Sequence, residues 1–189
     1  PDARYIHIVR DVRNCALSSK KVWGTNLFRY SQRWYDSVSS AEEFLGGTCG
    51  DRALTVRFED LTANPATSVR GICGFLGLDY DDSLTRLSEP TEHHGDAKEL
   101  MGVMAQDGGK YRRHMSVGEI EKIESIAWPL LDRFGYPFDF EGKPRRISRP
   151  GMRWLQLLDV IHRFAFDVRE QGPGRLLHVL RTKMTHFRK

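Results

Sequence analysis

The sequence predicts an α/β domain, a parallel sheet with flanking helices, followed by a C-terminal helical extension. Two short apolar runs, Tyr5–Val9 and Leu54–Phe58, are rich in β-branched and aromatic residues and are typical of strands. The first run has the continuous apolar pattern of a strand that is buried on both faces. Each run precedes residues with helical spacing, and a capping box at Ser116–Glu119 begins a further helix. Strands that alternate with helices favour a parallel sheet.

The composition is that of an ordinary globular protein. The chain has 189 residues, of which 40% are hydrophobic and 29% charged, enough for one domain with a core. No apolar run approaches the roughly 20 residues that cross a bilayer, and no secretory signal opens the sequence. Three scattered cysteines, Cys15, Cys49 and Cys73, lack metal-ligand spacing. We therefore expect a cytoplasmic protein with reduced cysteines and without a bound metal.

The net charge of +4 hides an uneven distribution. Residues 143–189 contain 12 Lys or Arg against 3 Asp or Glu, a net charge of +9. Residues 1–142 contain 17 basic and 22 acidic residues, a net charge of −5. The sequence therefore divides into a domain at 1–142 and a basic extension at 143–189, and we expect no nucleic-acid partner.

The first strand ends at Arg10, and a helix is predicted over Asp11–Val22 with Asp11 as its N-cap. Ligands bind at the carboxyl ends of strands in open α/β sheets, which is where Arg10 lies. Ser18 follows eight residues later, about two helical turns along. A guanidinium and a hydroxyl in these positions can converge on one anion. Alternatively, Arg10 pairs with Asp11 or Glu59 and Ser18 is solvated.

The remaining elements follow from turn and capping signals. Gly46-Gly47 is expected to end the second helix, Asn64-Pro65 to begin the third, and Gly77 to end it. The later helix from Ser116 contains Pro129. The predicted segments are a helix at Asn26–Leu45, a helix at Pro65–Leu76, a short helix at Asp81–Leu87, a loop at Ser88–Gly109 and a helix from Ser116 to Gly135.

Three blocks in order resemble the sulfotransferases that use 3′-phosphoadenosine 5′-phosphosulfate (PAPS). Arg4–Ser19 resembles the element of that family that binds the 3′-phosphate. Leu54–Leu78 is similar to a second block, and Gly108–Glu124 with Leu131–Tyr136 to a third. The resemblance covers about residues 4–137. It implies a P-loop sulfotransferase fold and transfer of a sulfuryl group from PAPS to a hydroxyl or amine of a small-molecule or carbohydrate acceptor.

The resemblance also implies which residues bind the nucleotide. Arg10 and Ser18 occupy the positions that hold the 3′-phosphate. Phe58 stands where relatives usually carry a tyrosine that packs on adenine, although core packing explains a phenylalanine there equally well. The segment after Gly109 matches an aromatic and basic pair that closes over the nucleotide. The predicted cofactor-binding residues are Arg10, Ser18, Phe58, Lys110, Tyr111 and Arg112; no catalytic residue is identified.

The glycine-rich loop that binds the 5′-phosphosulfate in the family has no counterpart in this sequence. Two predicted strands are also too few for a stable α/β sheet. We therefore expect a domain that is incomplete at the N-terminus, or completed by another chain, and inactive alone. Two other functions remain open: another P-loop nucleotide-binding enzyme such as a kinase, and a non-catalytic binding or assembly module.

The extension is predicted to form two helices separated by Gly172-Pro173-Gly174. Met152–Glu170 carries an apolar stripe that includes Leu155, Leu158 and Ile161. The second helix is expected at Leu176–Phe187. Because the apolar face is wide, we expect residues 149–189 to pack on the domain or on a second copy. The alternative is a basic helix that lies on an anionic membrane.

Overall fold

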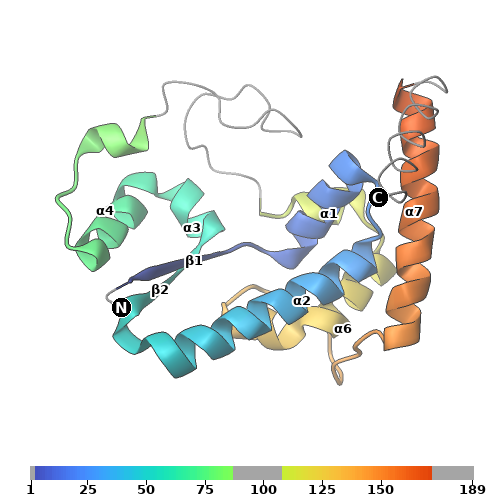
Figure 1. The fold of residues 1–189 in the computed structure, drawn as a ribbon, viewed down its shortest axis with the longest axis horizontal. Helices are drawn as coiled ribbons and strands as arrows, with labels where there is room; N and C mark the ends of the chain where they lie inside the picture. The colour runs from blue at the N-terminus through green and yellow to red at the C-terminus, as the bar shows by residue number, and fades with distance from the viewer. Residues whose placement is uncertain (1–2, 87–107, 172–189) are drawn as a thin grey trace, which may run out of the picture.

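The computed structural model of the protein describes residues 3–86 and 108–171, with side chains described as far as Ile161 (Figure 1). The elements are β1 (Tyr5–Val9), α1 (Val12–Trp23), α2 (Leu27–Phe44), β2 (Ala53–Arg57), α3 (Phe58–Ala63), α4 (Pro65–Leu76), α5 (Lys110–His114), α6 (Val117–Arg133) and α7 (Arg149–Gln171). Most of the predicted loop at 88–109 and the helix predicted at 176–187 lie outside the described residues.

The sheet of the described chain consists of β1 and β2, which are parallel. Tyr5 lies opposite Ala53 and Val9 opposite Arg57, so both strands end at the same edge. Helices follow each strand directly, which confirms the α/β class and the parallel pairing. The second strand ends one residue earlier than predicted, because Phe58 begins α3.

The prediction that β1 is buried on both faces is wrong. Val9 is buried, whereas Ile6 and Ile8 are 39% and 52% exposed. A strand becomes buried on both faces only when neighbours flank and cover it. Within the described chain β1 pairs with β2 alone, which leaves these two isoleucines outside the core.

The ends of α1 and α2 illustrate local capping. Asp11 accepts a hydrogen bond from the backbone N–H of Arg13 (2.8 Å), and α1 ends at Gly24 in the left-handed region (φ 62°). The α-helical part of α2 ends at Phe44, one residue before the predicted end at Leu45, but the glycine cap predicted at Gly46-Gly47 is wrong. The chain continues through a π-helical turn over Leu45–Cys49, and the positive φ occurs at Gly50 (53°). Glycine permits the left-handed conformation without requiring it.

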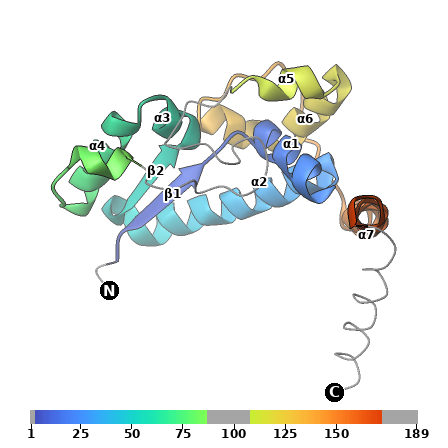
Figure 2. The same ribbon diagram turned by 90° about the horizontal axis from the view of Figure 1, so that it is seen from above.

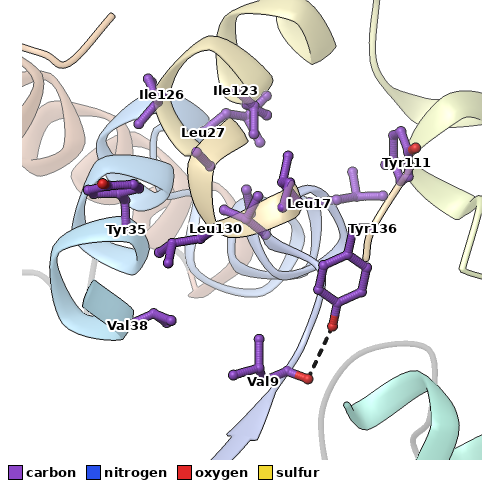
Figure 3. Close-up of a cluster of buried hydrophobic side chains, with 14 of the residues drawn as sticks. Val9, Leu17, Leu27, Tyr35, Val38, Tyr111, Ile123, Ile126, Leu130 and Tyr136 are labelled. Carbon is purple, nitrogen blue, oxygen red and sulfur yellow. Dashed lines mark hydrogen bonds between the residues drawn. The ribbon is translucent and has the colours of Figure 1, made fainter. Parts of the chain in front are cut away.

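The core lies where α1, α2 and α6 meet the end of β1 (Figure 3). The capping box at Ser116 and Glu119 begins α6 as predicted, and the positive φ of Gly135 follows its end. The fully buried side chains include Val9, Val12, Ala16, Ile123, Ile126, Ala127 and Leu131. On α4 only Cys73 is buried. The short helix predicted at 81–87 is a 3₁₀ turn, Asp82–Thr85.

The segment before α7 is held against the domain. The N–H of Ile147 donates to Gln32 on α2 (2.9 Å), and that of Arg145 donates to the carbonyl of Ser125 on α6 (2.7 Å). α7 stands at the margin of the molecule, beyond the first turns of α2 (Figure 2). Of the residues described, none belongs to a helix long and apolar enough to cross a membrane.

Candidate anion-binding site

The register of the sheet brings Arg10 and Phe58 together. Val9 of β1 and Arg57 of β2 are paired, so the residue that follows each strand lies at the same edge of the sheet. The guanidinium carbon of Arg10 lies 4.6 Å from the centroid of the Phe58 ring. This cation–π contact fixes Arg10 at the carboxyl ends of the strands, between β1 and the first turn of α1.

Asp11 and Glu59, the acidic residues considered as partners of Arg10, also contact other groups. The carboxylate of Asp11 accepts from the side chain of Arg13. Glu59 accepts from the N–H of Asp11 (3.1 Å) and from the hydroxyl of Tyr136 (2.7 Å). Burial and the hydrogen bond to Glu59 raise the pKa of Tyr136, so this hydroxyl stays a donor. The carbonyl of Val9 lies 3.2 Å from the same hydroxyl and shares its single proton as the weaker acceptor (Figure 3).

A buried ion pair beneath the strand ends joins α1 to α6. The Arg13 side chain is fully buried and contacts Asp11 (2.7 Å) and Glu124 (2.5 Å). The second carboxylate oxygen of Glu124 accepts the N–H groups of Asp139 and Phe140. Every charge in the group therefore has a partner, as buried charges require.

Tyr111 places α5 on this buried pair. Its ring lies 4.4 Å from the guanidinium carbon of Arg13, and the residue is 2% exposed. The amide of Asn14 on α1 donates to the carbonyl of Gly108, just before α5 (2.9 Å). Figure 2 shows α5 lying over α1 as a result.

Basic side chains of α1 and α5 form the electrostatic part of the site. Burial lowers the pKa of Lys110, and the positive charges of Lys21, Arg10 and Arg113 lower it further. The pKa of His114 is lowered first by the charge of Lys21. Like charges nearby disfavour a protonated amine, and the packing of α5 on α1 through Tyr111 and Asn14 brings Lys110 into these surroundings. We call Arg10, Lys21, Lys110 and Arg113 the basic cluster; together they can hold a multiply charged anion.

The predicted site residues separate into two groups. Arg10, Phe58 and Lys110 belong to the strand ends and the basic cluster, and Ser18 is exposed on α1. Tyr111 is instead a buried packing residue. Arg112 is directed to Asp139, with a distance of 3.2 Å between the charged atoms. Its neighbour Arg113, rather than Arg112, shares the electrostatic environment of Lys110.

Sequence reasoning missed Lys21 as a member of the site. It lies three residues after Ser18 on α1, and Arg113 lies three residues after Lys110 on α5. Side chains three residues apart are neighbours on a helix surface. This spacing was the available signal for Lys21, although its meaning depends on how α5 packs against α1.

A cavity of about 300 Å³ opens between the end of α1 and α2. Its lining includes Thr25, Tyr30, Arg33 and Trp34. Burial raises the pKa of Tyr30, and the positive charge of Arg10 lowers it. Burial also raises the pKa of the nearby Cys15 to about 12, which keeps that thiol protonated.

Residues 1–82 match the family model described as "Sulfotransferase family". This match confirms the sulfotransferase resemblance for the part of the chain that contains β1, α1, α2 and β2, with Arg10 and Lys21 of the basic cluster. A search of curated proteins finds no match. In the described residues no group of three or more His, Cys, Asp or Glu side chains could hold a metal ion.

Two solved structures are similar in fold. One is the "Sulfotransferase Domain from the Curacin Biosynthetic Pathway", 18% identical, with a TM-score of 0.48 over 73% of this chain and 55% of that chain. The other is mouse sulfotransferase SULT7A1 complexed with PAP, 17% identical, with a TM-score of 0.47 over 71% of this chain and 63% of that chain. The chain thus spans between half and two thirds of the length of these two proteins.

Proposed function

We propose that this chain supplies the 3′-phosphate side of the PAPS site in a sulfotransferase that transfers a sulfuryl group to a hydroxyl or amine. The observation that carries the proposal is the place of Arg10 at the carboxyl end of β1, 4.6 Å from the Phe58 ring, with Lys110 of α5 close enough to be influenced by its charge. A phosphate with two negative charges is the ligand that such a cluster stabilises best. The match of residues 1–82 to the sulfotransferase family supports the same donor.

Each predicted residue then has a distinct role. Arg10 offers its planar donors to the 3′-phosphate, and Ser18 adds a hydroxyl from α1. Arg10 covers one face of Phe58, so the adenine would stack on the opposite face of that ring. Tyr111 positions α5 through Arg13 rather than contacting the nucleotide. Arg112 reaches the nucleotide only when it leaves Asp139.

The acceptor is proposed to be a small molecule or carbohydrate in the cytoplasm. The cavity lined by Tyr30 and Trp34 is large enough for a small ring system, and the charge of Arg10 acts on Tyr30. The rings of Tyr30 and Trp34 can pack on an apolar body, and Arg33 and Thr25 can hydrogen-bond to hydroxyl groups of the same molecule.

A comparison of Lys21 with its neighbour Lys20 tests the phosphate site. Lys20 is half-exposed and pairs with Glu119 (3.4 Å), whereas Lys21 acts on Lys110. We expect Lys21→Ala to weaken binding of PAP, the 3′,5′-bisphosphate product, by roughly threefold to tenfold through loss of one nearby charge. Lys20→Ala should leave PAP affinity unchanged. Isothermal titration calorimetry measures both, and equal effects of the two variants would contradict the assignment.

AMP and ADP separate the sulfotransferase proposal from a kinase-like site. AMP differs from PAP only in lacking the 3′-phosphate, and ADP carries a longer 5′ chain without it. A site built on the 3′-phosphate prefers PAP to both, because only PAP uses the basic cluster. Equal or tighter binding of ADP would favour another P-loop nucleotide-binding enzyme, and absence of nucleotide binding would favour an assembly module.

We further propose that the 189 residues bind the nucleotide without catalysing transfer. Stabilising a transferred sulfuryl group requires donors directed at its oxygens, as in phosphoryl transfer. In the described chain β1 reaches α1 through Arg10 and Asp11, and β2 runs directly into α3, so no glycine-rich loop follows either strand. We expect no transfer from labelled PAPS to a panel of phenols, sugars and amines. Turnover above that of Arg10→Ala would show that other residues provide the donors.

A further inference from the structure

We propose that the outer face of α7 docks on an anionic membrane surface. The inner face of α7 is fixed to the domain by Asp159, which is 3% exposed. Its carboxylate accepts from the N–H of Asn26 (2.7 Å) and pairs with Arg29 (2.5 Å) at the start of α2. Leu155 and Leu158 are partly buried beside it. The helix is thus anchored along one side only.

The opposite side of α7 presents large apolar groups to solvent. Trp154, Leu157, Val160 and Ile161 are 61%, 51%, 61% and 53% exposed. At 100° per residue these positions fall within an arc of about 120° along the helix. The described domain therefore leaves this outer face uncovered, and the expected packing of the first C-terminal helix on the domain holds only for its inner side. Packing on a second copy stays a prediction. Contiguous exposed apolar groups mark an interaction surface.

The charge around the outer face is positive, which favours an anionic partner. Asp159 is the single acidic residue within 149–161, and it is turned into the domain. Arg149 and Arg153 are exposed on the same helix, and residues 143–189 carry a net charge of +9. Anionic lipid headgroups attract such a basic segment, while apolar side chains enter the boundary between headgroups and acyl chains. Tryptophan is favoured at that depth.

Other occupants fit this face less well. A second copy would bring two clusters of arginine together without acidic groups on the outer face to neutralise them. A nucleic acid would satisfy the positive charge and leave Trp154, Leu157 and Val160 in contact with water or phosphate. An anionic bilayer surface satisfies both the charge and the apolar groups.

Vesicle sedimentation with the full chain tests the proposal. We expect binding to phosphatidylcholine vesicles that contain about one third phosphatidylserine, and weaker binding in high salt or to phosphatidylcholine alone. Leu157→Glu should reduce binding by about tenfold or more, because it places a charge in the apolar stripe. Leu84→Glu is the matched control, since Leu84 is equally exposed (53%) on the 3₁₀ turn of Asp82–Thr85, and it should bind as the unaltered protein does.

A second variant separates charge from apolar contact. Arg149→Gln with Arg153→Gln should weaken binding to the anionic vesicles while leaving circular dichroism unchanged. The proposal is overturned if the unaltered chain fails to bind anionic vesicles, or if Leu157→Glu and Leu84→Glu bind equally. A dimer seen by sedimentation velocity that Leu157→Glu abolishes, without vesicle binding, would identify a second copy as the occupant instead.

Discussion

Replacing Arg13 by methionine should lower the free energy of unfolding by about 3–5 kcal/mol, the cost of leaving buried partners of an ion pair uncompensated. The Arg13 and Glu124 side chains are fully buried and Asp11 nearly so. Methionine fills much of the volume but cannot neutralise two carboxylates. The Tyr111 ring would also lose its cation, so α5 should loosen from α1. Urea denaturation followed by circular dichroism measures the loss.

An exposed ion pair provides the control for Arg13. Arg133 pairs with Glu42 while its own side chain is 62% exposed, and Arg133→Met should cost about 0–1 kcal/mol. Combining Arg13→Met with Glu124→Met removes one orphaned carboxylate and should recover part of the stability. If Arg13→Met and Arg133→Met lower the free energy of unfolding equally, the buried ion pair contributes no more to stability than the exposed one.

Replacing Arg10 by alanine should weaken PAP binding by about 1.5–3 kcal/mol, the value of hydrogen bonds to a charged group. This corresponds to roughly a tenfold to hundredfold rise in the dissociation constant. AMP lacks the 3′-phosphate, so its affinity should change little. Ser18→Ala removes one neutral hydroxyl and should cost less than Arg10→Ala. Calorimetry with both nucleotides forms a cycle that isolates the 3′-phosphate contribution.

Arg70 offers a matched control for the loss of a stacked arginine. Its guanidinium lies 4.4 Å from the Tyr80 ring centroid, much as Arg10 lies 4.6 Å from that of Phe58. Arg70→Ala therefore removes a similar cation–π contact on α4 and should leave PAP affinity intact. If the Arg10→Ala variant prefers PAP to AMP as strongly as the unaltered chain does, Arg10 does not bind the 3′-phosphate.

Features that depend on neighbouring residues were predictable from the sequence. Caps and periodicity act locally, so each such feature is encoded by residues close together in the sequence. Examples are the strand at Tyr5–Val9, the N-cap at Asp11 and the capping box at Ser116. The position of Arg10 at a strand end followed from the same local pattern. Local signals were therefore enough to predict the α/β class and the half of the candidate site that lies at the end of β1.

The other half of the site depends on how distant segments pack. Lys21 and Lys110 are separated by 89 positions in the sequence and act on each other because α5 lies on α1. Tyr111 is buried because its ring packs on the guanidinium group of Arg13. Likewise, Asp159 turns one side of α7 toward α2 and leaves Trp154 outside. Helical periodicity shows which residues share a face, but only the tertiary contacts decide which face is covered, since burial is a property of the neighbours.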